Sequence, residues 1–222
     1  MTPVGMPADT KWLELRQAMG LMDMTGVVEG SHTYSGQERD LLFPHGVGMY
    51  GDRFSYHLVD FPDWMLRGGT DPTAMLSRDA YQGRVGGQRV LAEAQARFPG
   101  QDILLCNLDA DEILSAETVA SLRAHPPPRN LVVSCSLRWH LYSTHWSLPQ
   151  NWTLCMCVRV GPETRPEDVD LEAARFRASR QANWPAEKVY PEYPVHGWHF
   201  TWFLTPKESV AKMLAYTHRD VL

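Results

Sequence analysis

The sequence predicts an α/β protein with a largely parallel, twisted sheet flanked by helices. Short apolar runs alternate with helical patterns along most of the 222 residues, and this order is typical of strands joined by crossover helices. The run Ile103–Leu108 is apolar on both faces for most of its length, as in a central strand that is covered from both sides. Hydrophobic residues make up 44% and charged residues 21% of the chain. This is an ordinary globular composition, and the length suits a single domain over residues 1–222.

Six strands are expected from apolar runs that are bounded by turn residues. In chain order they are Gly26–Glu29, Tyr56–Asp60, Asp102–Leu108, Leu131–Leu137, Thr153–Val160 and Trp198–Leu204. Ligands of such sheets bind beyond the carboxyl ends of the strands, so residues that follow these runs are the first candidates for a site.

Helices are predicted from their capping residues. Asp71 before a proline begins a segment that Pro99 and a glycine end, and glycines at positions 83, 86 and 87 are expected to divide it into two helices. Ser115 caps a short helix, and Thr205 with Glu208 forms a capping box for a helix to about residue 216. Residues 166–180 are acidic at the start and rich in arginine at the end, as the helix dipole favours.

Composition excludes several classes of protein. The net charge of −5 excludes a generally basic nucleic-acid binder. The sequence has no run of 18 apolar residues, so a membrane span is not expected, and the N-terminus lacks the pattern of a signal peptide. We therefore expect a cytoplasmic protein whose cysteines are buried thiols in a reducing compartment: Cys106, Cys135, Cys155 and Cys157.

The most informative segment is the acidic end of the run at residues 102–113. Asp109, Asp111 and Glu112 directly follow a buried strand. Side chains two positions apart in an extended chain point the same way, so Asp109 and Asp111 are expected to converge. Their repulsion is costly unless a cation offsets it, and Mg²⁺ or Mn²⁺ with open positions for phosphate oxygens would do so. This indicates a nucleotide-diphosphate site. The alternative is a solvated turn that caps the helix at Ser115.

Six stretches, in order along the chain, resemble glycosyltransferase family 17, whose best-known members are the β-1,4-mannosyl-glycoprotein N-acetylglucosaminyltransferases. The stretches are Leu13–Arg16 (LELR), Val27–Gly36 (VVEGSHTYSG), Arg78–Gln82 (RDAYQ), Leu108–Ile113 (LDADEI), Gly197–Trp202 (GWHFTW) and Thr217–Asp220 (THRD). Residues 1–11 depart from the family's opening pattern and the chain stops soon after Asp220, so an abbreviated first strand and fewer C-terminal helices are expected.

The resemblance implies a GT-A type fold and a metal-dependent, inverting transfer of a sugar from a nucleotide-diphosphate sugar, with a UDP-sugar favoured. Asp109 and Asp111 would hold Mn²⁺ or Mg²⁺, and His199 is a candidate for a further ligand. Residues that match the family's motifs, or lie near them, are the candidates for donor binding: Glu29, His32, Arg78, Gln82, Asp109, Lys212 and His218.

An inverting reaction also needs a base that takes the proton of the acceptor hydroxyl, and Glu192 and Glu112 are the candidates. The expected acceptor is a saccharide or a small molecule, which aromatic side chains at residues 139–152 could stack on. One alternative acceptor is a hydroxymethylated pyrimidine in phage-type modified DNA, bound by a basic stretch of Arg165, Arg175, Arg177, Arg180 and Trp184. A second alternative is a non-catalytic module that binds sugar nucleotides.

Overall fold

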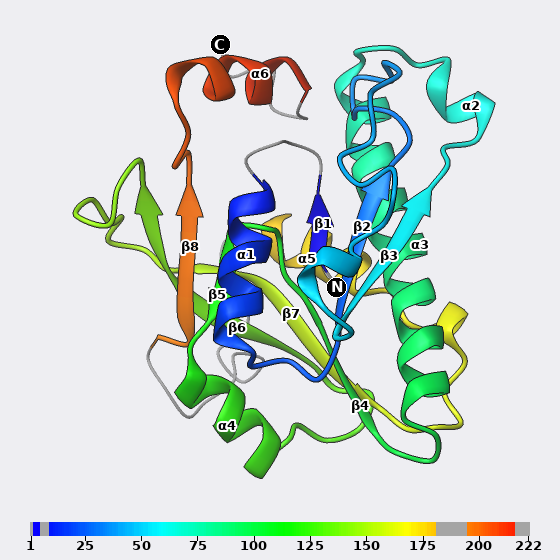
Figure 1. Ribbon diagram of the computed structural model, residues 1–222, viewed down its shortest axis with the longest axis vertical. Coiled ribbons are helices and arrows are strands. Elements are labelled where there is room, and N and C mark those ends of the chain that lie inside the picture. Colours follow the sequence, from blue (N-terminus) through cyan, green and yellow to red (C-terminus); the bar gives the residue numbers. More distant parts are fainter. Residues whose placement is uncertain (1, 5–8, 181–194, 216–222) are drawn as a thin grey trace.

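The protein is a mixed α/β structure with two separate sheets (Figure 1). This computed structural model describes residues 2–4, 9–180 and 195–215. The smaller sheet is parallel, in the order β1 (Thr2–Val4), β2 (Thr25–Gly30) and β3 (Phe54–Val59). The larger sheet has the order β4 (Ile103–Asn107), β7 (Trp152–Val160), β6 (Val132–Leu141), β8 (Gly197–Thr201) and β5 (Glu112–Leu114).

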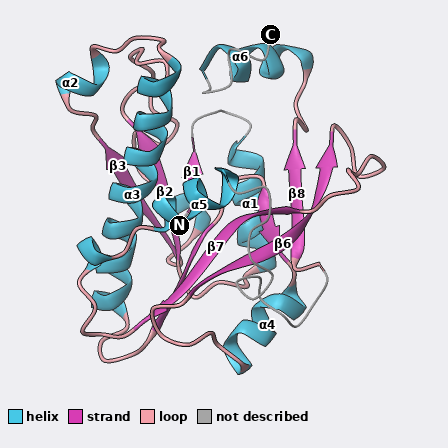
Figure 2. Ribbon diagram, turned by 180° about the vertical axis from the view of Figure 1, so that it is seen from behind, coloured by secondary structure: helices cyan, strands magenta, loops and turns pink. Residues whose placement is uncertain are grey.

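Helices cover both sheets (Figure 2). The longest, α3 (Pro72–Arg97), packs against β2 and β3, and α5 (Leu171–Arg180) lies against β7 and α3. The remaining helical elements are α1 (Asp9–Met19), η1 (Gly48–Tyr50), α2 (Asp63–Leu66), α4 (Ala116–Ala124), η2 (Pro166–Asp168) and α6 (Pro206–Ala215).

The α/β class is confirmed, but the larger sheet is mixed and is not mostly parallel as predicted. In it β4–β7, β6–β7 and β5–β8 are antiparallel, and β6–β8 is parallel. A short connection joins β6 to β7, and neighbouring strands joined this way run antiparallel. All six expected strands are present with shifted ends, whereas β1, β5 and α1 were not predicted, because each is short or weakly patterned.

The predicted division of the long helical segment is wrong, since α3 runs unbroken from Pro72 to Arg97. Its glycines serve close packing. A Cβ atom at Gly86 would lie 2.3 Å from the side chain of Val28 in β2, and one at Gly83 would lie 2.3 Å from Glu172 in α5. The absence of side chains at these positions lets α3 approach β2 and α5 closely.

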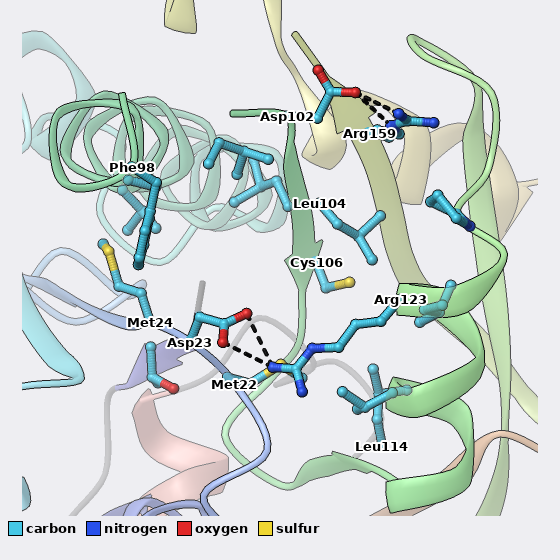
Figure 3. A pocket seen from close by; sticks show the side chains of 18 of the residues that line it. Met22, Asp23, Met24, Phe98, Asp102, Leu104, Cys106, Leu114, Arg123 and Arg159 are labelled. Carbon is cyan, nitrogen blue, oxygen red and sulfur yellow. Dashed lines mark hydrogen bonds and ion pairs between the residues drawn. The ribbon is translucent and has the colours of Figure 1, made fainter. Parts of the chain in front are cut away.

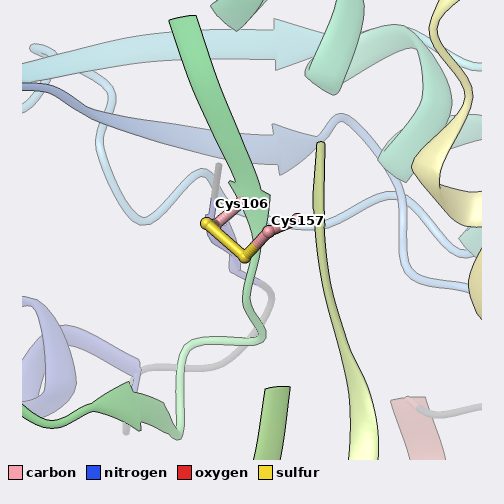
Figure 4. The surroundings of a disulfide bond; sticks show 2 residues. All are labelled: Cys106 and Cys157. Atoms are coloured by element: carbon pink, nitrogen blue, oxygen red, sulfur yellow. A yellow bond between two sulfur atoms is a disulfide. The ribbon is translucent and has the colours of Figure 1, made fainter. Parts of the chain in front are cut away.

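Two of the four cysteines are not free thiols, contrary to the prediction. Cys106 of β4 and Cys157 of β7 face each other in register and form a disulfide (Figure 4). Cys135 and Cys155 are buried and not disulfide-bonded. The prediction failed because the pairing of β4 with β7 depends on contacts 51 residues apart, which the local pattern does not report.

Candidate active site

The acidic turn, Asp109–Glu112, connects β4 to β5, and α1 fixes its shape. An Nη of Arg16 donates hydrogen bonds to the carbonyl oxygens of Asp109 at 2.7 Å and Glu112 at 2.5 Å. Burial lowers the pKa of Arg16 to about 10, although the nearby acids favour its charge. The arginine of the LELR stretch therefore holds the backbone of the acidic turn, a role that the sequence analysis did not assign.

The carboxylate of Asp109 binds an arginine. Arg175 of α5 donates from its two Nη atoms to the two oxygens of Asp109, at 2.8 and 2.7 Å. The same guanidinium lies 3.4 Å from Glu172 and 3.7 Å from Glu112. Burial alone would raise the pKa of Asp109, but the charge and hydrogen bonds of Arg175 hold it below its usual value. The sequence analysis assigned Arg175 to a DNA-binding stretch, whereas the structure places it inside the acidic cluster.

Asp111 and His199 lie together, as predicted for residues of one site. Nε2 of His199 is 3.5 Å from Oδ1 of Asp111, because β8 pairs with β5 directly after the acidic turn. Burial disfavours the imidazolium, but Asp111 and the neighbouring acids outweigh it and raise the pKa of His199. The rings of Trp139 and Trp152 lie 5.9 and 4.4 Å from the imidazole, centroid to centroid, and fix its orientation.

Glu112 is fully buried and supports the turn from within. Its carboxylate accepts hydrogen bonds from the indole N–H of Trp152 and, at 3.0 Å, from the backbone N–H of Asp109. Burial, together with the charge of Asp109, raises the pKa of Glu112 to about 7. These contacts favour a positioning role over that of a base in contact with an acceptor.

Two further acids complete the cluster. Asp79 lies in the RDAYQ stretch of the resemblance, but the sequence analysis assigned a role to neither acid. Asp79 of α3 is half-buried and hydrogen-bonds Tyr34, and burial raises its pKa to about 7, with Glu172 and Asp109 adding to the effect. Glu172 of α5 accepts a hydrogen bond from the side-chain amide of Asn107, and burial raises its pKa. The acidic cluster thus comprises Asp79, Asp109, Glu112 and Glu172 near the guanidinium of Arg175, together with Asp111, which interacts with Asp109 and Glu112.

The predicted donor-binding residues on β2 and the loop after it hold that loop in place. The buried carboxylate of Glu29 accepts from an Nη of Arg39 at 2.6 Å, from the backbone N–H of Leu42 at 2.7 Å and from the hydroxyl of Tyr56 at 2.8 Å. Nδ1 of His32 lies 3.0 Å from the hydroxyl of the preceding serine. Their assignment to donor binding stays a prediction.

Arg78 and Gln82 lie on one face of α3, as the spacing predicted, and both are buried. The guanidinium of Arg78 donates to the carbonyl oxygens of Tyr34, Met65 and Gly69. Gln82 donates to the carbonyl oxygen of Val28 at 3.4 Å. Arg78 therefore ties the loops that flank α3, and its assignment to donor binding also stays a prediction.

For three of the predicted site residues the structure describes no side chain. Glu192 and His218 lie outside the described residues, and for Lys212 the structure describes only the backbone, in α6.

Among the described side chains, one group of three or more His, Cys, Asp or Glu has its ligand atoms within 4.8 Å of one another: Cys135, Cys155 and Cys157. Cys157 is already bonded to Cys106, so this group offers two free thiols. The predicted ligands Asp109, Asp111 and His199 do not form such a group as they stand.

No known family model matches the chain, and no curated protein sequence matches it. Within the described ranges, each helix is too short or too polar to span a bilayer.

Proposed function

We propose that the protein is a metal-dependent glycosyltransferase that moves a sugar from a nucleotide-diphosphate sugar to a hydroxyl group of a saccharide or a small molecule, with inversion. The observation that carries the proposal is the placement of Asp111 beside His199 in a cluster of five carboxylates at the carboxyl end of β4. Such a cluster calls for a cation. The resemblance to glycosyltransferase family 17 supports the same assignment through the acidic turn and the GWH stretch of β8.

The residues fit Mn²⁺ or Mg²⁺ in part. Asp111 and His199 would hold the ion from one side, and carboxylate and imidazole ligands both suit Mn²⁺. Asp109 would join them only after its carboxylate leaves Arg175. A divalent ion held by few protein ligands keeps positions for substrate phosphates. Bound there, it would supply Lewis-acid stabilisation of a departing diphosphate.

The protein's own residues would prepare the site in three ways. Arg16 keeps the acidic turn in place through its backbone carbonyls. Trp139 and Trp152 orient His199. Arg175, once released from Asp109, is a guanidinium within reach of a bound diphosphate, whose oxygens it would bind as a two-pronged donor.

A GT-A type arrangement is part of the proposal. The parallel strands β1, β2 and β3 precede the acidic turn in the chain, as does β4 of the mixed sheet, and the other mixed strands, β5 to β8, follow β4. This order supports a donor-binding half built on the parallel strands and an acceptor half built on β5 to β8.

Modified DNA is less favoured as the acceptor. Its support was a basic stretch, but Arg175 is engaged with Asp109 and Arg165 pairs with Asp168 at 2.8 Å. Arg177 is exposed on α5. The side chain of Arg180 and all of Trp184 lie outside the described part of the chain. Among the described arginines of this stretch, Arg177 is the one that is exposed without an ion pair to an acid named here, and a single such arginine supplies little of the phosphate affinity that such a protein needs.

The test is a thermal-shift screen of nucleotide sugars, each with and without Mn²⁺. A ligand that binds the folded state raises the melting temperature, so one donor should stabilise the protein only when Mn²⁺ is present. The same donor should then be consumed by the protein with an acceptor panel, and NMR of the product should show the inverted anomer. Asp111→Asn should abolish the Mn²⁺-dependent shift. Asp52→Asn, which changes an exposed acid in the turn before β3, should keep it. Absence of a shift with every donor would refute the proposal. A Mn²⁺-dependent shift without transfer would favour the non-catalytic module.

A further inference from the structure

Four cysteines project from one face of the larger sheet. Cys106 of β4 lies opposite Cys157 of β7. Cys155 of β7 lies opposite Cys135 of β6. Opposed residues of antiparallel strands share a face, as do Cys155 and Cys157, which are two positions apart in one strand. All four belong to the core cluster to which α4 contributes, so their sulfur atoms gather in one buried place that the proposed sugar transfer does not use.

Three of these sulfur atoms have nearly the spacing of metal ligands. The Sγ atoms of Cys135, Cys155 and Cys157 lie within 4.8 Å of one another, and all three residues are fully buried. Cys135 and Cys155 share a hydrogen bond. A Zn²⁺ ion that bonds sulfur at its usual length holds its ligand sulfur atoms about 3.8–4.0 Å apart. Small rotations of the three side chains would therefore bring the sulfur atoms to that spacing.

The disulfide withholds one of the three ligands. Sγ of Cys157 is bonded to Cys106 (Figure 4), and the thiolate is the form of cysteine that binds metals. The structure thus has two thiols and one blocked sulfur at this place. Reduction of the bond between Cys106 and Cys157 would complete a set of three sulfur ligands.

The two sulfur atoms of the disulfide differ in how they can be reached. Of the four cysteines, all of which the structure describes, Cys106 alone lines the cavity of about 590 Å³ that β4 borders with α3 and α4 (Figure 3). Cys106 is 9% exposed, whereas Cys157 is fully buried. A small dithiol that enters the cavity therefore meets Sγ of Cys106 first.

Opening of the disulfide from this side is an ordinary thiol–disulfide exchange. A thiolate of the dithiol attacks Sγ of Cys106, the bond to Cys157 breaks, and Cys157 leaves as a thiolate. The second thiol of the reagent then displaces Cys106, which takes up a proton, and the reagent departs as its own disulfide with the loss of two electrons. The sulfur that is set free first, on Cys157, is the one beside Cys135 and Cys155, where an ion can bind it.

Nearby charges partly offset the negative charge of a thiolate site. Arg16 and Arg175 both interact electrostatically with Cys155 and favour its thiolate, while Glu112 opposes it. A soft divalent ion would supply further positive charge, and thiolates prefer such an ion to Mg²⁺ or Mn²⁺. The cysteine group therefore differs in its metal preference from the carboxylates of the acidic cluster.

We propose that Cys135, Cys155 and Cys157 form a binding site for one soft divalent ion of the Zn²⁺ kind, and that the site opens when the Cys106–Cys157 disulfide is reduced. Once reduced, Cys106 lies beside Cys157 and can supply a fourth sulfur. Cys106 is thus the point at which the reductant enters and the group that keeps the site closed.

The experiment titrates Cd²⁺, as a probe, into the full chain in two states. One is the unreduced chain, and the other has been treated with a small dithiol that is then removed by gel filtration without air. Bonds between sulfur and Cd²⁺ give a charge-transfer absorption in the ultraviolet. We expect the reduced chain to bind one Cd²⁺ with this absorption and Zn²⁺ to compete for the site. The unreduced chain should bind Cd²⁺ at least about tenfold more weakly, because one ligand is withheld.

Two matched variants separate the closing group from the ligands. Cys106→Ser and Cys157→Ser both remove the disulfide, but only the second removes one of the three ligands. Kept free of air, Cys106→Ser should bind Cd²⁺ without prior reduction, and Cys157→Ser should bind it at least about tenfold more weakly in either state. Equal Cd²⁺ affinity of the two variants would overturn the proposal. So would absence of the absorption from the reduced, unchanged chain, which is a result that does not depend on whether the variants fold.

These readouts are independent of the proposed function. Asp111→Asn, which should abolish the Mn²⁺-dependent shift at the acidic cluster, should keep the absorption of sulfur-bound Cd²⁺, and Cys155→Ser should lose it. The opposite pattern would assign the ion to the acidic cluster and overturn the cysteine site. A negative screen of nucleotide sugars would leave the Cd²⁺ result unchanged.

Discussion

Arg175→Gln is the perturbation that tests most directly whether the acidic cluster binds a metal. The arginine and Asp109 form a two-point pair with 12% and 27% of their side chains exposed. Removing one partner of such a largely buried pair typically costs about 3–5 kcal/mol. Because Asp109 is partly exposed, we expect the lower end, about 3 kcal/mol. For a protein of this size that lowers the melting temperature by about 6–12 °C in a metal-free buffer.

The same change should strengthen metal binding. If Arg175 and a divalent ion compete for Asp109, the variant should bind Mn²⁺ at least about tenfold more tightly than the unchanged protein, which corresponds to about 1.4 kcal/mol. Isothermal titration calorimetry and electron paramagnetic resonance of free Mn²⁺ measure this without substrate. Mn²⁺ should also restore part of the lost melting temperature.

Two further variants make the result decisive. Arg177→Gln removes an exposed arginine from the same helix and should change neither stability nor Mn²⁺ affinity. Arg175→Lys keeps the charge but loses the fork, so its Mn²⁺ affinity should lie between those of the glutamine variant and the unchanged protein. If Arg175→Gln folds and binds Mn²⁺ no more tightly than the unchanged protein, Asp109 is not a ligand that the arginine withholds, and the reasoning is refuted.

Three other predictions concern the supports of the site. Arg16→Gln should lower the free energy of unfolding by about 2–3 kcal/mol in urea titrations, because it removes charged hydrogen bonds to the acidic turn. The control is Arg53→Gln, which removes a hydrogen bond from an exposed arginine to a carbonyl oxygen. It should lower the free energy of unfolding by less than about 1 kcal/mol. Asp79 has a pKa of about 7 in the folded protein, above its unfolded value of about 3.9. Between these two values the folded state binds more protons at Asp79 than the unfolded state does. The stability of the metal-free protein should therefore fall as the pH rises from about 4 to 7. In Asp79→Asn the melting temperature should vary less with pH over that range, and an equally steep profile would contradict the assignment. Glu29→Gln should cost about 3 kcal/mol by breaking the buried pair with Arg39 and should speed hydrogen exchange at residues 36–43, whereas unchanged exchange there would show that Glu29 does not hold this loop.

The strands were predictable where burial alone selects the residues. Ile103–Asn107 is a strand because its side chains are apolar on both faces, and the two core clusters on either side of it show why. Its acidic end was also predictable, since acids that directly follow a buried strand need partners. The direction of the later strands was not predictable, because pairing of β8 with both β5 and β6 depends on contacts between distant segments.

The partners of the acids escaped prediction for the same reason. Arg175 belongs to the arginine-rich end of the helix predicted at residues 166–180, and the helix dipole gave it a sufficient local explanation. Its pairing with Asp109 spans 66 residues. Arg16 was noted as part of the LELR stretch, but its role was not predicted. Its hydrogen bond to the acidic turn joins residues that are 93 positions apart, which a local pattern does not show.

The number of arginines at the acidic cluster also bears on whether the cluster first binds a cation or an anion. The acidic cluster has five carboxylates, and Arg175 pairs with some of them. The nearby Arg16 donates its hydrogen bonds to backbone carbonyl oxygens. Above about pH 7, where Asp79 and Glu112 are ionised, the five carboxylates outnumber the guanidinium groups of Arg16 and Arg175, and solvent screens this excess of negative charge little because the groups are largely buried. A divalent cation offsets this excess, whereas a polyanion such as DNA adds to it unless a cation is bound first. For this reason we infer that metal binding precedes any phosphate-bearing substrate at this site, and that titrations with a nucleotide sugar alone should show little binding until Mn²⁺ is supplied.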